Sequence, residues 1–223
     1  MSDLTNIKAV IFDMDGLLLD SERIALATFV AACRENDFEP DVAVYYRCIG
    51  GNDSRTREVL TEGYGEGFHY DTVMASWQKK NEEEASTRAF PVKPGALHLL
   101  QGLKARKIKM AVVTSTPRDS AVRKLSNAGM LPFFEFVIGG DQIKNSKPHP
   151  EIYLTACRRL GEKPSDCLAL EDSDNGVLSA TAAGLTVIQV PDLLSPSEKV
   201  KALGHRIVSS LVEVEELLRE AKR

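Results

Sequence analysis

The chain has 223 residues, of which 43% are hydrophobic and 27% are charged, with a formal net charge of −4 at pH 7. These values are ordinary for a globular protein and leave no basic surplus for binding nucleic acid or an anionic membrane. No apolar run approaches the roughly 20 residues that cross a bilayer, and residues 1–6 lack the pattern of a signal peptide. The four cysteines show no metal-binding spacing, so we expect reduced thiols and a cytoplasmic location.

Short apolar runs alternate with segments of helical periodicity along most of the chain. The strand-like runs are residues 7–12, 110–114, 134–138, 167–170 and 185–190, with a weaker sixth run at 206–209. The helical segments between and after the later runs are residues 96–106, 120–128, 150–160, 175–183 and 211–222. This alternation predicts an α/β fold built on a mostly parallel sheet.

The alternation is interrupted between residues 19 and 88. This stretch has no strand-like run, and its helical parts are residues 22–35, 53–60 and 72–85. We therefore predict a helical domain of residues 19–88, inserted into a core of residues 1–18 and 89–223. Such an insertion would lie above the carboxyl ends of the strands, where it would exclude water and select substrates.

The first strand-like run ends in two acids. Residues 7–12 are interrupted only by Lys8, and Asp13 and Asp15 follow. Residues two apart on an extended chain share a face, so both carboxylates can reach one metal ion or one substrate. Desolvating two like charges is costly unless a cation or a reaction uses them. A helix cap and a turn acid are the alternative.

Hydroxyl groups follow the second strand-like run, where Thr114, Ser115 and Thr116 precede Pro117. Hydroxyls and unpaired backbone amides at the start of a helix form a binding site for anions. The alternative is an ordinary helix start, in which Thr116 and Asp119 form a capping box and Pro117 takes the first helical position.

Charged residues also follow the third and fourth runs. Lys147 would hold a phosphate and offset nearby carboxylates; a solvated surface lysine is the alternative. Glu171 and Asp172 form a second acid pair that suits Mg²⁺, which prefers oxygen ligands; Asp172 as a helix cap is the alternative. All four clusters would meet at one edge of the sheet, which favours a joint metal and phosphate site over four unrelated structural features.

The segments DMDGLLLDSE, VVTS, SKPHPEIY and ALEDSDNG occur in this order along the chain. They resemble the haloacid dehalogenase superfamily, and within it the branch of helical-cap phosphatases and β-phosphoglucomutases. The resemblance runs from Lys8 to about Val190. It implies a Rossmann-like three-layer core, a helical cap inserted after the first strand, and a Mg²⁺ cofactor.

The resemblance also implies roles for single residues. Asp13 would be the nucleophile that forms an aspartyl-phosphate, and Asp15 would be the general acid and then the general base. Thr114, together with Ser115 and Thr116, would bind the phosphoryl group.

Lys147 would neutralise the phosphoryl group in the same scheme. Mg²⁺ would be held by Asp13, by the backbone carbonyl of Asp15, by Asp172, and by Glu171 directly or through water. Dehalogenases and phosphonatases of the superfamily lack an acid at the position of Asp15, so the resemblance implies phosphate-ester chemistry. We expect hydrolysis of a small phosphate ester, with sugar phosphates ahead of nucleotide-like phosphates.

The helical insertion is less informative. Gly50 and Lys80 are the predicted contacts to substrate. Asp53 stands where related mutases carry an arginine, and Ala25 where a histidine often occurs, whereas Lys80 with Asn81 resembles a mutase pair. A phosphosugar mutase and a non-catalytic phosphate-binding module remain alternatives. The physiological substrate and the oligomeric state stay open.

Overall fold

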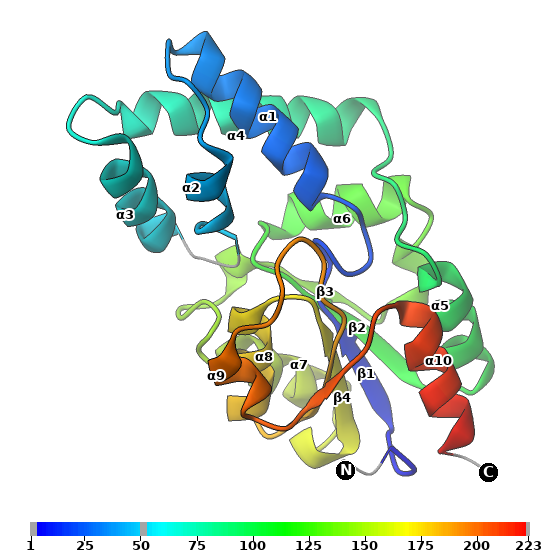
Figure 1. Ribbon diagram of the computed structural model, residues 1–223. Helices are drawn as coiled ribbons and strands as arrows, with labels where there is room; N and C mark the ends of the chain where they lie inside the picture. The colour runs from blue at the N-terminus through cyan, green and yellow to red at the C-terminus, as the bar shows by residue number, and fades with distance from the viewer. Residues whose placement is uncertain (1–3, 50–52, 222–223) are drawn as a thin grey trace.

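The computed structural model describes residues 4–49 and 53–221; of Asp53 only the backbone is described. Six strands form one sheet in the order β3-β2-β1-β4-β5-β6, and every neighbouring pair runs parallel (Figure 1). The strands are β1 (Ala9–Phe12), β2 (Lys109–Val113), β3 (Val137–Ile138), β4 (Cys167–Glu171), β5 (Thr186–Gln189) and β6 (Arg206–Ile207). The predicted α/β class with a parallel sheet is confirmed.

Helices cover both faces of the sheet. Val10 and Phe12 of β1 face one apolar cluster, while Ala9 and Ile11 face a second cluster on the other side, as the alternation of side chains along a strand requires. The first face is covered by α5 (Ala96–Ala105), α6 (Arg118–Asn127) and α10 (Leu211–Glu220). The second face is covered by α7 (Glu151–Leu160), α8 (Asp174–Ala182) and the short α9 (Glu198–Lys201).

A helical segment (residues 19–88) stands apart from the sheet in Figure 1. It contains α1 (Glu22–Glu35), α2 (Val42–Tyr46), α3 (Asp53–Tyr64) and α4 (Tyr70–Thr87). Its buried centre is a separate apolar cluster, in which the ring of Phe29 lies 5.1 Å from that of Tyr45 and 5.3 Å from that of Trp77. The segment therefore has an apolar core of its own.

The two connections between the helical segment and the sheet lie side by side. The amide of Asp20 donates to the carbonyl of Pro91 (2.8 Å), and the amide of Lys93 donates to the carbonyl of Leu18 (2.9 Å). The chain thus leaves the core after β1 and returns before α5 at adjoining points. The predicted boundaries at residues 18/19 and 88/89 fall at or near these connections.

Several element predictions differ from the structure in length. The outer strands β3 and β6 are two residues long, shorter than predicted, because a strand at the edge of a sheet has only one neighbour. The helices α2 and α9 were not predicted, since five and four residues are too few to show periodicity. All four cysteines are free and buried. Among the described helices, none is both long and apolar enough to cross a membrane.

Candidate active site

The predicted polar clusters lie along one edge of the sheet. Strands β2, β1 and β4 are neighbours, and a predicted site residue lies at the carboxyl end of each. Thr114 follows β2, Asp13 follows β1, and Glu171 is the last residue of β4. Because parallel strands all end at the same edge, residues more than 150 positions apart in the chain become neighbours.

Lys147 reaches into the sheet edge from the loop before α7. Its Nζ lies 2.5 Å from Oδ1 of Asp13 and 2.6 Å from Oε1 of Glu171. The hydroxyl of Tyr153 donates to the same Glu171 oxygen at 2.5 Å. The side chain of Lys147 is only 5% exposed, so the alternative of a solvated surface lysine is wrong.

Three buried carboxylates gather around this lysine. Oxygen atoms of Asp13, Glu171 and Asp172 lie within 4.8 Å of one another. Burial raises the pKa of Asp13 to about 8, with Lys147 opposing the shift and Glu171 adding to it. Burial, followed by the charges of Asp13 and Glu171, raises the pKa of Asp172 well above its usual range. One lysine therefore does not balance the negative charge of this cluster.

The donor set of the cluster fits a hard divalent cation. Mg²⁺ takes oxygen ligands, commonly one or two carboxylates, and the cluster offers three buried carboxylates whose oxygen atoms lie within 4.8 Å of one another. The residues present thus fit the predicted metal.

Two glycines allow the carboxylates to come this close. Gly16 has a φ of +81°, which side chains other than glycine rarely adopt, and a Cβ there would lie 2.4 Å from Oδ2 of Asp172. A Cβ on Gly176 would lie 1.9 Å from Oε2 of Glu171. Both positions are consequently closed to larger residues while the carboxylates keep their places.

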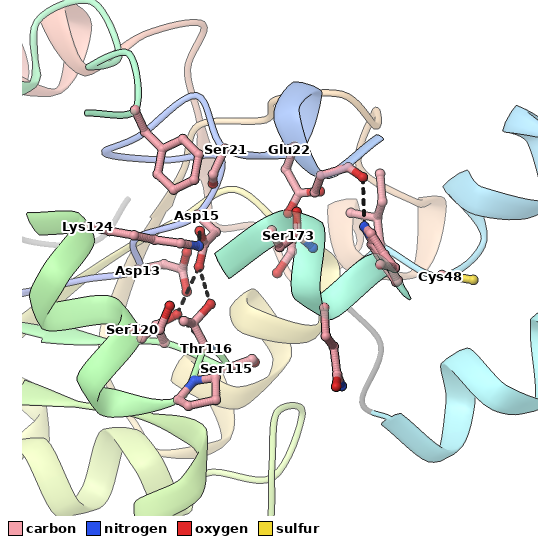
Figure 2. A pocket seen from close by; sticks show the side chains of 18 of the residues that line it. Asp13, Asp15, Ser21, Glu22, Cys48, Ser115, Thr116, Ser120, Lys124 and Ser173 are labelled. Atoms are coloured by element: carbon pink, nitrogen blue, oxygen red, sulfur yellow. Dashed lines mark hydrogen bonds and ion pairs between the residues drawn. The ribbon is translucent and has the colours of Figure 1, made fainter. Parts of the chain in front are cut away.

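Asp15 has a different environment from Asp13. Its Oδ1 accepts a hydrogen bond from Nζ of Lys124 (2.9 Å), and its Oδ2 accepts hydrogen bonds from the hydroxyls of Thr116 (2.7 Å) and Thr114 (3.2 Å). Burial raises the pKa of Asp15, but the Lys124 ammonium and the hydroxyl donors outweigh burial and lower it. The pKa of Asp13 is therefore raised, whereas that of Asp15, two residues later, is lowered. Figure 2 shows Lys124 and Thr116 directed at Asp15.

The capping box predicted for α6 is wrong. The helix begins at Arg118 with Pro117 as its N-cap residue, one position later than predicted. The amide of Arg118 donates to Oδ1 of Asp141 at 2.7 Å, so a residue from another loop caps the helix. The hydroxyl of Thr116 is free to bond Asp15 for that reason.

The start of α8 settles a second alternative. Ser173 is its N-cap residue, and its hydroxyl accepts a hydrogen bond from the amide of Gly176 at 3.2 Å. Asp172 is therefore not the helix cap, and its carboxylate stays with the acidic cluster.

A cavity of about 660 Å³ connects this cluster with the helical segment. The core lines one end with Asp13, Asp15, Thr114, Ser115, Thr116, Lys147 and Asp172. The helical segment lines the other end with Glu22, Ala25, Tyr45, Cys48, Ile49, Thr56, Trp77, Gln78, Asn81 and Glu82. Figure 2 shows side chains of both ends, among them Asp13 and Asp15 from the core and Glu22 and Cys48 from the helical segment.

Of the two predicted contacts from the helical segment, the structure describes only Lys80. Lys80 does not line it; its Nζ lies 2.8 Å from a carboxylate oxygen of Glu35. Asn81, the next residue, does line it. Gly50 lies outside the described residues.

Sequence reasoning missed Lys124, Tyr153 and Glu22. Lys124 lies about two helical turns after Thr116, away from the end of any strand. Its position on the face of α6 that meets Asp15 was the one signal of a role. Tyr153 was inside a quoted motif, yet nothing marked its hydroxyl as a donor. Burial, and after it the charges of Asp15 and Asp192, raise the pKa of Glu22 to about 7.

Known proteins are similar to this chain in sequence and in fold. Residues 10–190 match the family of haloacid dehalogenase-like hydrolases. A phosphorylated carbohydrates phosphatase of Thermotoga maritima is 30% identical over 220 residues, covering 96% of this chain and 98% of the relative. A validoxylamine A 7'-phosphate phosphatase of Streptomyces hygroscopicus subsp. limoneus is 31% identical over 184 residues, covering 80% of this chain and 83% of the relative.

A solved structure agrees with these relatives. A hydrolase of the same family from Deinococcus radiodurans, crystallised with bound phosphate and sodium, superposes with a TM-score of 0.80 at 25% identity, and 97% of each chain is covered. The predicted resemblance is confirmed: the chain belongs to the haloacid dehalogenase-like hydrolase family, in its branch of phosphatases and β-phosphoglucomutase-like proteins.

Proposed function

We propose that this protein is a Mg²⁺-dependent phosphatase that hydrolyses a small phosphorylated metabolite through an aspartyl-phosphate. One observation carries the proposal: Asp13, Glu171 and Asp172 converge around the buried Lys147 at one end of a closed-in cavity. Phosphoryl transfer depends mainly on positioning and charge stabilisation, and this cluster supplies both. The names of the relatives support the class of phosphoric monoester hydrolases.

Asp13 is the proposed nucleophile. Its carboxylate attacks phosphorus, the bond from phosphorus to the ester oxygen breaks, and a carboxyl–phosphate bond takes its place. Lys147, already 2.5 Å from Oδ1 of Asp13, offsets the negative charge of the phosphoryl group. Thr114 and Ser115 stand at the same end of the cavity and offer hydroxyl donors to the phosphoryl oxygens.

Asp15 is the proposed proton carrier. It donates a proton to the leaving alkoxide, and it then removes one from the water that hydrolyses the aspartyl-phosphate. With Lys124 at 2.9 Å, Asp15 is held as a carboxylate in the structure described here. We therefore expect Asp15 to leave Lys124 and take up a proton when substrate fills the cavity.

The proposed Mg²⁺ ligands are Asp13, Asp172, the backbone carbonyl of Asp15, and Glu171 directly or through water. When bound, the ion would draw charge from the phosphoryl oxygens and from Asp13. Tyr153 and Lys147 orient the carboxylate of Glu171 by hydrogen bonds to its Oε1, which is the kind of support that metal ligands commonly have.

We further propose that residues 19–88 act as a cap domain over the site. Its separate apolar core and its residues along the cavity support this division. Phosphorylated carbohydrates come first as substrates, because the relative from Thermotoga maritima is named a phosphatase of such compounds. A cytoplasmic location stays a prediction.

Hydrolysis is favoured over mutase activity by the placement of Lys80. A mutase must grip the second phosphate of a bisphosphate, and Lys80 is instead paired with Glu35 away from the cavity. A phosphorus NMR time course with β-glucose 1-phosphate and a bisphosphate primer separates the two activities: free phosphate alone supports hydrolysis, and glucose 6-phosphate would support the mutase.

The direct test is hydrolysis of p-nitrophenyl phosphate with and without Mg²⁺. We expect turnover that requires Mg²⁺ and that falls at least about 10³-fold in Asp13→Asn, since removal of a nucleophile commonly costs that much or more. Thermal unfolding of the variant checks that the fold is intact. Full activity of Asp13→Asn would contradict the nucleophile assignment, and a wild-type protein with no turnover would favour a phosphate-binding module.

A further inference from the structure

One face of α4 forms part of the cavity wall that the helical segment supplies. Trp77, Gln78, Asn81 and Glu82 all line the cavity. Their spacing of one, four and five positions places them on the same side of a helix. This wall therefore presents an indole ring, two amides and a carboxylate to the part of a substrate that lies beyond the phosphate.

Hydrogen bonds to α1 hold two of these side chains in place. Nε1 of Trp77 donates to the carbonyl of Ala25 (3.0 Å) and lies 3.1 Å from the hydroxyl of Thr28. The same hydroxyl donates to Oδ1 of Asn81 at 2.6 Å. The ring and the amide are thus fixed before any ligand arrives, which lowers the entropic cost of binding.

The helical segment offers carboxylates but no cation to this cavity. Glu22 and Glu82 line it, whereas no Lys, Arg or His of residues 19–49 and 54–88 does. The nearby cations are paired with acids of the same segment. These pairs are Arg47–Glu62, Arg55–Glu58, Arg57–Asp71, Lys79–Glu83, Lys80–Glu35 and Arg88–Glu84.

The core adds little positive charge beyond the catalytic cluster. Lys147 and Lys124 are already paired with Asp13 and Asp15. Arg123, on the exposed side of α6, is the remaining lining cation in the described chain, and Asp119 lines the cavity beside it. A second anionic group on a substrate would consequently face the carboxylates of Glu22, Glu82 and Asp119, with the exposed Arg123 as the one further lining cation among the described residues.

We propose that this cavity selects phosphate monoesters whose alcohol part is rich in hydroxyl or amino donors and carries no second anionic group. Carboxylates and amide oxygens accept hydrogen bonds from such donors, and the indole face of Trp77 packs against the carbon skeleton. The inference rests on the proposed function, because it concerns the leaving group of that reaction. It excludes bisphosphates and phosphorylated sugar acids as preferred substrates.

Two matched substrate pairs test the inference. Glucitol 6-phosphate and 6-phosphogluconate are both open chains that differ only in an alcohol or a carboxylate at C1. Glucose 6-phosphate and glucosamine 6-phosphate are both rings that differ in a neutral hydroxyl or an ammonium at C2. We expect kcat/KM for 6-phosphogluconate to be at least about ten-fold below that for glucitol 6-phosphate, and the amino sugar to match or exceed glucose 6-phosphate.

Charge reversal on α4 locates the effect. We expect Glu82→Lys to raise the kcat/KM ratio of 6-phosphogluconate to glucitol 6-phosphate by about ten-fold. Glu83→Lys is the matched control, because Glu83 is the next residue on α4 yet does not line the cavity; its ratio should stay within about two-fold of the wild-type ratio. Circular dichroism verifies that both variants are folded.

The outcomes separate this inference from the proposed function. If p-nitrophenyl phosphate is not hydrolysed at all, the proposed function fails and the inference with it. If it is hydrolysed but 6-phosphogluconate equals or exceeds glucitol 6-phosphate, or neither polyol ester is accepted, the inference alone is overturned. An equal response of Glu82→Lys and Glu83→Lys would also overturn it.

Discussion

The two ends of the cavity are built differently. At the sheet edge, Asp13, Lys147 and Glu171 are each less than a tenth exposed, and Lys147 donates hydrogen bonds to both acids. On the wall formed by α4, Gln78 and Glu82 are exposed. A buried charged group fixes its neighbours because losing any partner is costly, whereas an exposed polar group tolerates replacement. Under the proposed function, we expect the core end to set the reaction and the helical end to set the choice of substrate.

The sharpest way to break this comparison is to remove the proton carrier at the core end. Asp15→Asn should lower kcat/KM, which reports formation of the aspartyl-phosphate and not its later hydrolysis, by about 10²- to 10⁴-fold for sugar phosphates, because general acid catalysis commonly contributes that much. The loss should be much smaller for p-nitrophenyl phosphate, whose leaving group needs no proton. Steady-state kinetics with both substrates makes the measurement. Equal losses would mean that Asp15 does not protonate the leaving group.

Lys147→Met tests whether burial makes the core end rigid. The substitution leaves Asp13 and Glu171 without their shared cation, and breaking such a buried pair costs about 3–5 kcal/mol. We expect a lower melting temperature at neutral pH, partly restored by Mg²⁺, together with severe loss of activity. Lys144→Met is the control, since Lys144 is exposed on the same loop. A shift of similar size in both variants would contradict the role of Lys147.

Mg²⁺ binding should depend on pH through the acids of the core end. Without metal, the pKa of Asp13 is raised to about 8, so its proton must leave before the carboxylate can bind the ion. Affinity should rise between pH 6 and 8, by up to about ten-fold per pH unit. Because the folded pKa lies above the unfolded one, the metal-free protein should lose stability as pH rises toward 8.

Calorimetry in buffers of different ionisation enthalpy measures both the affinity and the protons released. Release of one or more protons per Mg²⁺ near pH 7 is the expected result. Binding that releases no proton and does not vary with pH would mean that Asp13 and Asp172 are already ionised in the metal-free protein.

The smallest expected effect comes from adding a single methyl group. Gly176→Ala should destabilise the protein by about 1–3 kcal/mol, because the new Cβ would overlap the carboxylate of Glu171. Gly67→Ala is the control, since nothing lies within 4 Å of a Cβ there. Thermal unfolding compares the two. An unchanged melting temperature for Gly176→Ala would show that Glu171 moves aside easily.

The core end was largely predictable from the sequence because its residues directly follow strands. Asp13, Thr114 and Asp172 needed only the position at which an apolar run ends. The acids and Lys147 were therefore identified without knowledge of a single distance.

Other parts depended on contacts between distant residues. The predicted capping box at Thr116 was wrong because Asp141, which lies in another loop, caps the helix by accepting a hydrogen bond from the amide of Arg118. Lys124 was missed because the face of α6 that meets Asp15 depends on how that helix packs. Substrate contacts were expected near Trp77 and Lys80, but helical periodicity does not say which polar residues of α4 face a cavity.

The adjoining connections between core and helical segment have an evolutionary consequence. The amides of Asp20 and Lys93 hold the outgoing and returning chain together, so the about 70 residues between them join the core as a short loop would. The entropic cost of closing a loop rises only slowly with its length. Inserted segments of different length or shape can therefore start and end at the same two connections without disturbing the sheet edge. Under the proposed function, a new substrate preference can then arise by replacement of the helical segment, while the acids and Lys147 at the sheet edge stay unchanged.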